Sequence, residues 1–415
     1  MTDVLYLTHN GITDHIGQSQ IAPYNLGLAR RGYRIHIVSA EKPGREELMD
    51  HYRQLFAEAG IRWSWVPYHN QPQVAAQLFD VARMRALALR IAREEQPRLV
   101  HSRSWLPLEI GLAVKQATGA RFLLDFRHFF IESGVQDSRF PWVYKLLGTR
   151  EAGYFRAADH VVTLTHKAAE VLEKRYPGTA GLDRYTVIPC CADFDHFDLD
   201  RVERSRIAVV RSQLGLQPDQ PVLLYLGSIG AVYLLDEMIR LFTEFRKLRP
   251  DARFLFVCNN GREEIAAAAA AAGLPADSIS IVHASRDEVP AYLALASLSV
   301  MFFRPDLSLA GCSPTKMAEL FAANVPMISN AGVGDLERIL SPSRNASVVV
   351  HDFRPATLRQ AIEQVLAVPR EVRSATRAGA GEFTLDYGVD RYASIYDRLI
   401  GPPQTADHMP EVAFA

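Results

Sequence analysis

The chain has 415 residues, of which 48% are apolar and 22% charged, and its net charge is −1. This length exceeds one ordinary core and predicts two domains of roughly 200 residues each. The near-zero charge argues against a dedicated nucleic-acid binder. The four cysteines lack metal spacing, and no uncharged run approaches the roughly 18 residues of a membrane span, so we expect a cytoplasmic protein.

Short apolar runs alternate with helical patterns through the first half of the chain. This alternation predicts a parallel sheet with helices on both faces. The predicted elements are strands at Val4–Thr8, Ile35–Ser39, Arg98–His101, Phe122–Asp125, His160–Leu164 and Val187–Pro189, and a helix at Ser19–Arg31 that ends at Gly32.

The same alternation restarts after a polar helix at Arg204–Leu214 and predicts a second doubly wound unit. We place the first domain at residues 1–200 and the second at residues 201–383. The ligands of such sheets bind at the carboxyl ends of the strands. The predicted elements are strands at Pro221–Leu226, Arg253–Val257, Ile279–Val282 and Ser297–Phe303, and helices at Leu234–Lys247 and Glu263–Ala272.

The most informative segment begins at Ser313 and reads as a helix start, a short helix and a buried strand. Ser313 suits the N-cap and Pro314 the first helical position. The unpaired amides of that first turn and the charge of Lys316 predict an anion site. Glu319 lies one turn on, where it would reach a sugar hydroxyl beside the bound phosphate. A capped helix with an intrahelical Lys–Glu pair explains the same residues without a ligand.

Two strand ends of the first half carry polar groups that suit a ligand. The loop Thr8–Gln20 holds two glycines that allow close backbone approach, but it is not a dinucleotide fingerprint, and a merely long loop is the alternative. The tip at Asp125 continues with Arg127, which suits a carboxylate or phosphate, and His128, which suits a donor or base. A structural Asp–Arg pair is the alternative there.

In the second half, the small residues of Gly227–Gly230 follow the unit's first strand, which suits a pyrophosphate. Asp193 and Asp195 resemble a metal-binding Asp-x-Asp. No third hard ligand is evident in the sequence, so we expect no metal site there.

Taken together, these segments resemble the retaining, nucleotide-sugar-dependent glycosyltransferases of family 4, which have the GT-B fold. The resemblance implies two Rossmann-like domains that face each other across a cleft, with acceptor on the first and donor on the second. It also implies a final helix, at residues 384–401, that returns to the first domain. Residues 402–415 are polar and Pro-rich and predict a disordered tail. The carrying segments are Gly11–Gln20, Asp125–His128, Val187–Asp193, Tyr225–Gly230 and Ser313–Glu319.

The chain departs from the family pattern at two places. Glu319 resembles the second glutamate of the family's Glu–seven–Glu motif, which holds the donor ribose, but the first glutamate falls at Gly311. The family's Arg/Lys pair is replaced by Ala231 and Val232. These departures favour a resemblance to the branch of the family that builds bacterial cell-surface polysaccharide. They also leave open that the enzyme is weakened or inactive.

The resemblance therefore implies transfer of a sugar from a nucleotide-sugar donor to a glycan or lipid-linked glycan, with retention and without a metal or other cofactor. A nucleotide-sugar epimerase of the same fold and a catalytically weak partner in a polysaccharide assembly complex stay as alternatives. The predicted site residues are Lys316, Arg127 and His128 as catalytic groups, Glu319, Ser313, Thr315, Gly227, Ser228, Gly230 and Arg286 for the donor, and Gly17, Gln18, Asp14 and Arg103 for the acceptor.

The segment Phe140–Arg150 mixes aromatic and basic residues. Such a segment suits peripheral contact with the cytoplasmic face of the inner membrane, where a lipid-linked acceptor would lie. The alternative is that Trp142, Tyr144 and Leu147 belong to a helix core.

Overall fold

The computed structural model describes residues 2–177 and 184–403. They fall into two compact units, one that holds the chain to Ile188 and again from Leu385, and one that spans Pro189–Thr384. We predicted the first domain to run to residue 200, whereas residues 189–200 belong to the second unit. The amide of Cys190 donates to Ser313 Oγ at 3.1 Å, which ties this segment to the second unit. The predicted disordered tail lies outside the described residues from 404 onward.

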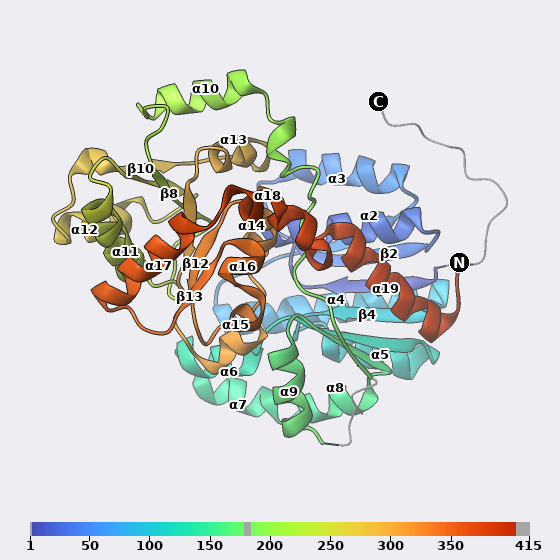
Figure 1. Cartoon of the computed structure of the whole chain (residues 1–415). Helices are drawn as coiled ribbons and strands as arrows, with labels where there is room; N and C mark the ends of the chain where they lie inside the picture. The colour runs from blue at the N-terminus through green and yellow to red at the C-terminus, as the bar shows by residue number, and fades with distance from the viewer. Residues whose placement is uncertain (1, 178–183, 404–415) are drawn as a thin grey trace. The chain divides into compact units, whose positions relative to one another are not determined.

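The first unit is built on a parallel seven-stranded sheet of order β3-β2-β1-β4-β5-β6-β7 (Figure 1). Strand β1 has no exposed residue, as expected of a strand covered on both faces. The elements are β1 (Val4–Thr8), α1 (His15–Gln20), α2 (Ala22–Arg30), β2 (Ile35–Glu41), α3 (Glu46–Glu58), β3 (Arg62–Pro67), α4 (Gln73–Glu95), β4 (Leu99–Arg103), α5 (Leu108–Thr118), β5 (Arg121–Phe126), α6 (Phe130–Asp137), α7 (Pro141–Gly148), α8 (Glu151–Ala157), β6 (His160–Thr163), α9 (His166–Arg175), β7 (Tyr185–Val187) and α19 (Leu385–Ile400).

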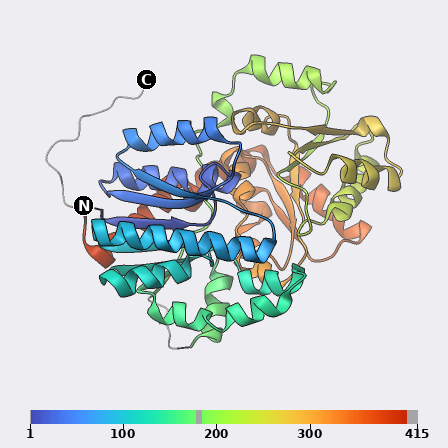
Figure 2. The same ribbon diagram turned by 180° about the vertical axis from the view of Figure 1, so that it is seen from behind.

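Successive residues of β4 show how the two faces of this sheet are covered. His101 Nδ1 meets Tyr396 Oη of α19 at 2.7 Å, so this residue faces the C-terminal helix. The next residue, Ser102, lies against Gly111 of α5 on the opposite face, where a Cβ would come within 2.2 Å of Ser102 Oγ. Figure 2 shows the blue and cyan helices of this unit as layers on either side of its strands.

Helix α19 belongs to the first unit although it follows the whole of the second in sequence. It packs beside α2, where Gly27 leaves room for Val389. Tyr33 donates to the Ala393 carbonyl at 3.0 Å, and the Arg31 guanidinium is paired with Asp390. Helix α19 therefore helps to form the core on one face of the first sheet.

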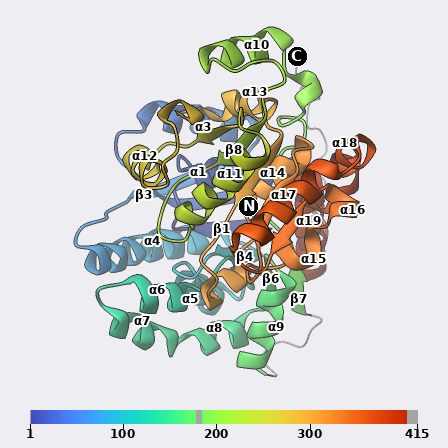
Figure 3. The same cartoon turned by 60° about the vertical axis from the view of Figure 1, so that its left-hand side comes forward.

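The second unit is built on a parallel six-stranded sheet of order β10-β9-β8-β11-β12-β13. Figure 3 shows its α11 and α17 side by side, where Arg359 reaches Glu244 at 2.8 Å. The elements are α10 (Arg204–Gln213), β8 (Val222–Leu226), α11 (Leu235–Leu248), β9 (Arg253–Val257), α12 (Arg262–Ala271), β10 (Ile279–Val282), α13 (Val289–Leu293), β11 (Leu298–Met301), α14 (Thr315–Ala322), β12 (Met327–Asn330), α15 (Leu336–Ile339), α16 (Pro342–Asn345), β13 (Val348–Val350), α17 (Pro355–Ala367) and α18 (Arg370–Gly379), with short 3₁₀ turns at Leu199–Arg201, Ala276–Ser278, Arg286–Glu288, Leu307–Gly311 and Gly381–Phe383.

The alternation along β8 divides the second unit's core into two layers. Leu224 packs with residues of α13 and α14 on one face, whereas Tyr225 packs with residues of α11 and α17 on the other. Tyr225 is fully buried and stands next to the strand's carboxyl end. The ring of Tyr225 therefore lies next to the loop Gly227–Gly230, where we expect a ligand.

Candidate functional site

Helix α14 begins at Thr315, later than predicted. Pro314 occupies the N-cap with an extended ψ of 122°, and no side chain caps the helix. Ser313, which we predicted as the N-cap, instead accepts a hydrogen bond from the Cys190 amide at 3.1 Å. The prediction of Ser313 as a cap was wrong because its hydroxyl binds the segment that enters the unit.

Lys316 lies in the first turn of α14, and its buried ammonium lies against two aromatic rings that contact each other. Its Nζ is 4.4 Å from the ring centroids of both Tyr225 and Tyr233, and it donates to Tyr225 Oη at 3.3 Å. Within the part of the chain that the structure describes, this charge has no carboxylate in ion-pair contact. The ammonium is therefore stabilised mainly by ring faces, which compensate a buried charge only in part.

The surroundings of Lys316 shift its protonation and that of Glu319 toward their neutral forms. Burial lowers the pKa of Lys316 to about 7, although Glu319 and Cys312 act in the opposite direction. Burial raises the pKa of Glu319, with Arg286 and Lys316 opposing the shift. A dianionic ligand beside Lys316 would reverse the first shift, because an opposite charge favours the ammonium.

Glu319 pairs with Arg286 rather than with Lys316, the partner that an intrahelical pair would require. Arg286 Nη1 lies 3.7 Å from Glu319 Oε1, and its guanidinium covers the ring of Phe197 at 5.2 Å. The Arg286 carbonyl accepts a hydrogen bond from His196 Nε2 at 3.1 Å. His196 and Phe197 thus position the arginine that holds the Glu319 carboxylate.

Gly227, the first residue of the loop Gly227–Gly230, lies against Lys316. Gly227 has a φ of +121°, and a Cβ on it would come within 2.8 Å of Lys316 Nζ, so only glycine fits this position. The amides of Gly227 and Ile229 donate to Val257 O and Asn260 Oδ1 at 3.0 and 2.9 Å. Among the described residues, the amides of Ser228 and Gly230 are the loop donors left for a ligand.

In the first unit, the loop after β1 is held by Glu41, a buried residue that no sequence motif singled out. Its carboxylate accepts from the Ile12 and Thr13 amides at 2.7 and 3.2 Å, and from the hydroxyls of Thr13 and Ser39 at 2.9 and 2.6 Å. Gly11 is needed beside it, since a Cβ there would meet Glu41 Oε2 at 2.7 Å.

The three residues predicted for the acceptor in this loop make contacts within the first unit. Asp14 pairs with Lys42 at 2.9 Å and with Arg45 at 3.2 Å. Gln18 Nε2 donates to the Thr13 carbonyl at 2.9 Å. Gly17 is packed on the loop backbone, where a Cβ would meet the Gly11 carbonyl oxygen at 2.1 Å. These groups shape the loop at the carboxyl end of β1.

Arg103 and Arg127 lie at adjacent strand ends, because Arg103 is paired in register with Asp125. Arg103 Nη1 reaches Asn10 Oδ1 at 3.4 Å. Arg127 Nη1 lies 3.3 Å from both Asp125 Oδ1 and Tyr392 Oη, so α19 helps to hold it. His101 Nε2 lies 3.4 Å from the other oxygen of Asp125.

Asp125 and His128 titrate below their usual ranges. The charge of Arg127 holds the pKa of Asp125 well below its usual range against the opposing effect of burial. Desolvation and the charges of Arg103 and Arg127 lower the pKa of His128 to about 4. The His128 side chain is exposed, so the charges of the two arginines are the main physical cause of this lowered pKa. His128 is therefore a neutral imidazole at neutral pH.

Asp193 and Asp195 take structural roles. Asp193 Oδ1 accepts from the His196 amide at 3.1 Å, and Asp195 pairs with Arg201 at 3.0 Å. Across residues 2–177 and 184–403, no cluster of three or more histidine, cysteine or acidic side chains is arranged to hold a metal ion. Over the same residues, no helix has the length and apolar character of a membrane span.

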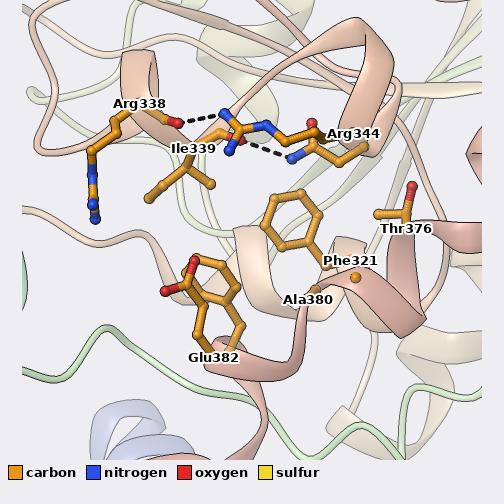
Figure 4. A pocket seen from close by; sticks show the side chains of 10 residues that line it. Phe321, Arg338, Ile339, Arg344, Thr376, Ala380 and Glu382 are labelled. Atoms are coloured by element: carbon orange, nitrogen blue, oxygen red, sulfur yellow. Dashed lines mark hydrogen bonds between the residues drawn. The ribbon is translucent and has the colours of Figure 1, made fainter.

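A small cavity of about 130 Å³ lies elsewhere in the second unit, and none of the predicted donor residues lines it (Figure 4). Arg344 Nη2 donates across its rim to the Arg338 carbonyl at 2.7 Å, and Asn345 Nδ2 to the Ile339 carbonyl at 2.9 Å. These polar groups are already bonded to the protein, so we do not assign the cavity to the donor site.

Two family models match the chain, one on each half. The glycosyl transferase 4-like domain matches residues 24–191, and the glycosyl transferases group 1 model matches residues 207–381. A curated relative, the D-inositol 3-phosphate glycosyltransferase of Segniliparus rotundus, is 25% identical over 314 residues. That match covers 72% of this chain but only 65% of the relative's length.

Solved structures share the fold at low sequence identity. A glycosyltransferase from Rickettsia africae superposes with a TM-score of 0.70 at 14% identity, over 96% of this chain and 98% of its own. The sucrose-phosphate synthase of Thermosynechococcus elongatus gives 0.69 at 17% identity, over 96% and 99%. Anabaena HepE in complex with UDP and glucose gives 0.65 at 15% identity, over 95% and 99%. The predicted GT-B architecture of two Rossmann-like domains is confirmed.

Proposed function

We propose, from the premise that this chain belongs to the GT-B glycosyltransferases with a 4-like first domain and a group 1 second domain, that it transfers a sugar from a nucleotide-sugar donor to a glycan or lipid-linked glycan with retention of configuration. The carrying observation is the buried ammonium of Lys316 beneath Gly227, a cation that lies beside a glycine loop and lacks a carboxylate partner. Such a cation suits an incoming diphosphate.

The proposed reaction places the growing negative charge next to Lys316. The bond between the sugar's anomeric carbon and the diphosphate oxygen breaks, and charge builds up on the leaving diphosphate. Lys316 and the amides of Ser228 and Gly230 would stabilise it without a metal ion. The acceptor hydroxyl attacks from the same face, forms the new bond to the anomeric carbon, and gives its proton to the diphosphate oxygen. Retention follows without a protein nucleophile.

We assign Glu319 to the donor ribose, whose two hydroxyls would donate to its carboxylate. Arg286 supports this role because it lies 3.7 Å from Glu319 Oε1 and opposes the shift of its pKa toward the neutral acid. Thr315 and Ser313 remain proposed donor neighbours at the start of α14.

We assign the acceptor to the carboxyl edge of the first unit's sheet. There the loop of Asp14, Gly17 and Gln18 adjoins Arg103 through the contact of Asn10 with that arginine. Arg127 and the neutral ring of His128 complete the edge and are proposed to orient the acceptor hydroxyl.

We propose that α7 and the preceding Phe140 make a peripheral contact with the cytoplasmic face of the inner membrane. Phe140, Trp142 and Leu146 are exposed, with Trp142 at 65%, whereas Tyr144 is buried in the unit. Lys145 lies on the same helix and is also exposed. Exposed aromatic and basic side chains together suit an anionic lipid surface, which would present a lipid-linked acceptor.

The test is consumption of a panel of UDP-, GDP-, dTDP- and ADP-sugars by the purified full chain in the presence of a chelator. We expect one nucleotide class to be hydrolysed slowly alone and faster with an acceptor. Conversion of the donor into its epimer, independent of acceptor, would establish the epimerase instead. Absence of consumption with every donor would leave the chain as a non-catalytic partner and contradict the proposal.

A further inference from the structure

A cluster of aromatic and polar side chains lies beyond the carboxyl end of β3, the edge strand of the first unit's sheet. It is formed after β3 and on α4 by Tyr68, His69, Phe79 and Asp80, and His9 of the β1 loop joins it through its ring. The His9 and Tyr68 rings meet edge-to-face at 5.6 Å. The Tyr68 amide donates to the backbone carbonyl of Glu41 at 2.8 Å, so the cluster is joined to the backbone of the residue whose carboxylate holds the β1 loop.

A buried carboxylate fixes the orientation of His69. Asp80 is 0% exposed, and its two oxygens accept from His69 Nδ1 at 2.6 Å and from the His69 amide at 2.7 Å. A carboxylate only accepts hydrogen bonds, so Nδ1 carries the proton. The second ring nitrogen, Nε2, is then the one available to a ligand, and the side chain is 42% exposed. Imidazoles positioned by a carboxylate in this way are common where the outer nitrogen has a task.

A second imidazole in the cluster has an unsatisfied atom. Nε2 of His9 is buried and has no hydrogen-bond partner among the described residues. Burial lowers the pKa of His9, while Asp80 and Asp14 oppose the shift. An unsatisfied buried nitrogen is costly, so a shift of the loop that brings a ligand hydroxyl to this atom would be favoured.

The rest of the cluster combines exposed aromatic surface with positive charge. Phe79 is 54% exposed, meets the His69 ring edge-to-face at 5.5 Å and lies under the Arg83 guanidinium at 5.7 Å. Lys42 covers the Tyr68 ring at 5.4 Å. Aromatic faces accept the apolar C–H face of a sugar ring, and Arg83 can accept a negative substituent on it, whereas Lys42 is already paired with Asp14.

The geometry points to an outer acceptor subsite at His9, Tyr68, His69 and Phe79, which binds a sugar residue carrying a carboxylate or phosphate group. Asp80 is its positioning residue. This inference rests on the proposed function, since it extends the same strand edge to which the acceptor is assigned. It implies an acceptor of at least two sugar units with negative charge away from the attacking hydroxyl.

The test uses the full chain with cellobiouronic acid and cellobiose, which differ in one carboxylate. Binding is measured by calorimetry with and without UDP, and the ring nitrogens are followed in ¹⁵N-histidine-labelled protein. We expect the charged disaccharide to bind at least about tenfold more tightly and to move the His69 and His9 resonances. His69→Gln should weaken the binding of both disaccharides, Arg83→Gln should remove the preference for the charged one, and Asp80→Asn should change the tautomer signal of His69. His351→Gln, an exposed histidine of the second unit, is the matched control.

Equal binding of the two disaccharides, or unmoved His69 and His9 resonances, would overturn the subsite. Loss of binding to anionic vesicles in His69→Gln, without any sugar effect, would assign the cluster to lipid instead and also overturn it. Nucleotide-sugar consumption is measured on the same samples. If consumption is present but the charged disaccharide does not bind, the subsite alone fails. If no donor is consumed, the proposed transfer fails.

Discussion

Buried charges at the carboxyl edges of the two sheets differ in how completely they are paired. At the first unit's edge, Glu41 accepts four hydrogen bonds, and Asp125 holds Arg127 and His101. At the second unit's edge, the ammonium of Lys316 has one hydrogen bond and two ring faces. The first arrangement fixes a surface in place, whereas the second leaves a charge that an anion would complete. Charge stabilisation is therefore expected from the second unit and positioning from the first.

The largest effect is expected at Lys316. Lys316→Met should lower kcat by about 10²–10³-fold, because the leaving-group charge grows in the transition state, with a smaller change in KM. The variant should be at least as stable as the parent near neutral pH, since it removes a poorly compensated buried cation. Steady-state kinetics and thermal unfolding measure both. The surface residue Lys247, in an ion pair with Glu244, supplies the control Lys247→Met, and a kcat loss of equal size there would refute the assignment.

Glu319→Gln should weaken nucleotide binding by about 10–100-fold, the equivalent of roughly 1.5–3 kcal/mol for hydrogen bonds to a charged group. Calorimetric titration with the preferred nucleotide is the measurement. Glu363→Gln, on the exposed face of α17, serves as the matched variant. If folded Glu319→Gln binds the nucleotide with unchanged affinity, the ribose does not bind this carboxylate.

Glu41→Gln tests the fixed edge rather than the chemistry. The glutamine amide nitrogen is a donor, whereas all four groups around the Glu41 carboxylate are also donors, so hydrogen bonds are lost. We therefore expect the free energy of unfolding to fall by about 3 kcal/mol. Urea denaturation followed by circular dichroism measures it, with exposed Glu47→Gln as the comparison. If both variants unfold at the same urea concentration, the carboxylate is not what holds the β1 loop.

Donor affinity should depend on pH through Lys316. Burial lowers the pKa of Lys316 to about 7 in the free protein, and a bound diphosphate would raise it. Full affinity is thus present below the free pKa, and it falls by up to about tenfold per pH unit as pH rises above 7 toward the pKa of the complex. Lys316→Arg should bind with little pH dependence over that range. A flat profile in the parent protein would show that Lys316 stays charged without the donor.

The smallest effect is expected for the membrane contact of α7. Each basic residue near anionic lipid contributes about 1 kcal/mol, so binding to anionic vesicles should be weak and reversed by salt. Cosedimentation of the parent and of Trp142→Ala with Lys145→Ala measures it at low and high salt. Retention of the parent in the supernatant at low salt, or equal sedimentation of both proteins, would contradict a membrane role for α7.

Much of the fold follows from the apolar runs. The predicted strands at Val4–Thr8 and Arg253–Val257 have the observed bounds, because a strand buried on both faces is largely apolar. The predicted strand at Ile279–Val282 also has the observed bounds, although it lies at a sheet edge and is only partly buried. Strand β3 was not predicted because Arg62, Ser64 and Pro67 interrupt its apolar run and only Val66 is buried. The predicted helix Ser19–Arg31 is two helices, since Pro23 at the start of α2 requires a break at Ile21.

The site was harder to predict than the fold. The roles of Lys316 and Glu319 were suggested by their spacing on one helix, but the rings that enclose Lys316 come from β8 and the loop after it. Likewise, Asp80 lies in the middle of an ordinary helical pattern, and its partner His69 becomes visible only once α4 packs against the end of β3. Local patterns indicate which residues can do chemistry, whereas tertiary packing decides which of them meet.

The most direct test of the central claim is the consumption of a nucleotide sugar by the parent protein and by Lys316→Met, with a chelator present throughout. We predict that the parent consumes one class of nucleotide sugar and releases its nucleoside diphosphate, and that Lys316→Met does so at least about 10²-fold more slowly. Equal rates in the two proteins would show that the buried ammonium does not stabilise the leaving diphosphate, and would contradict the account.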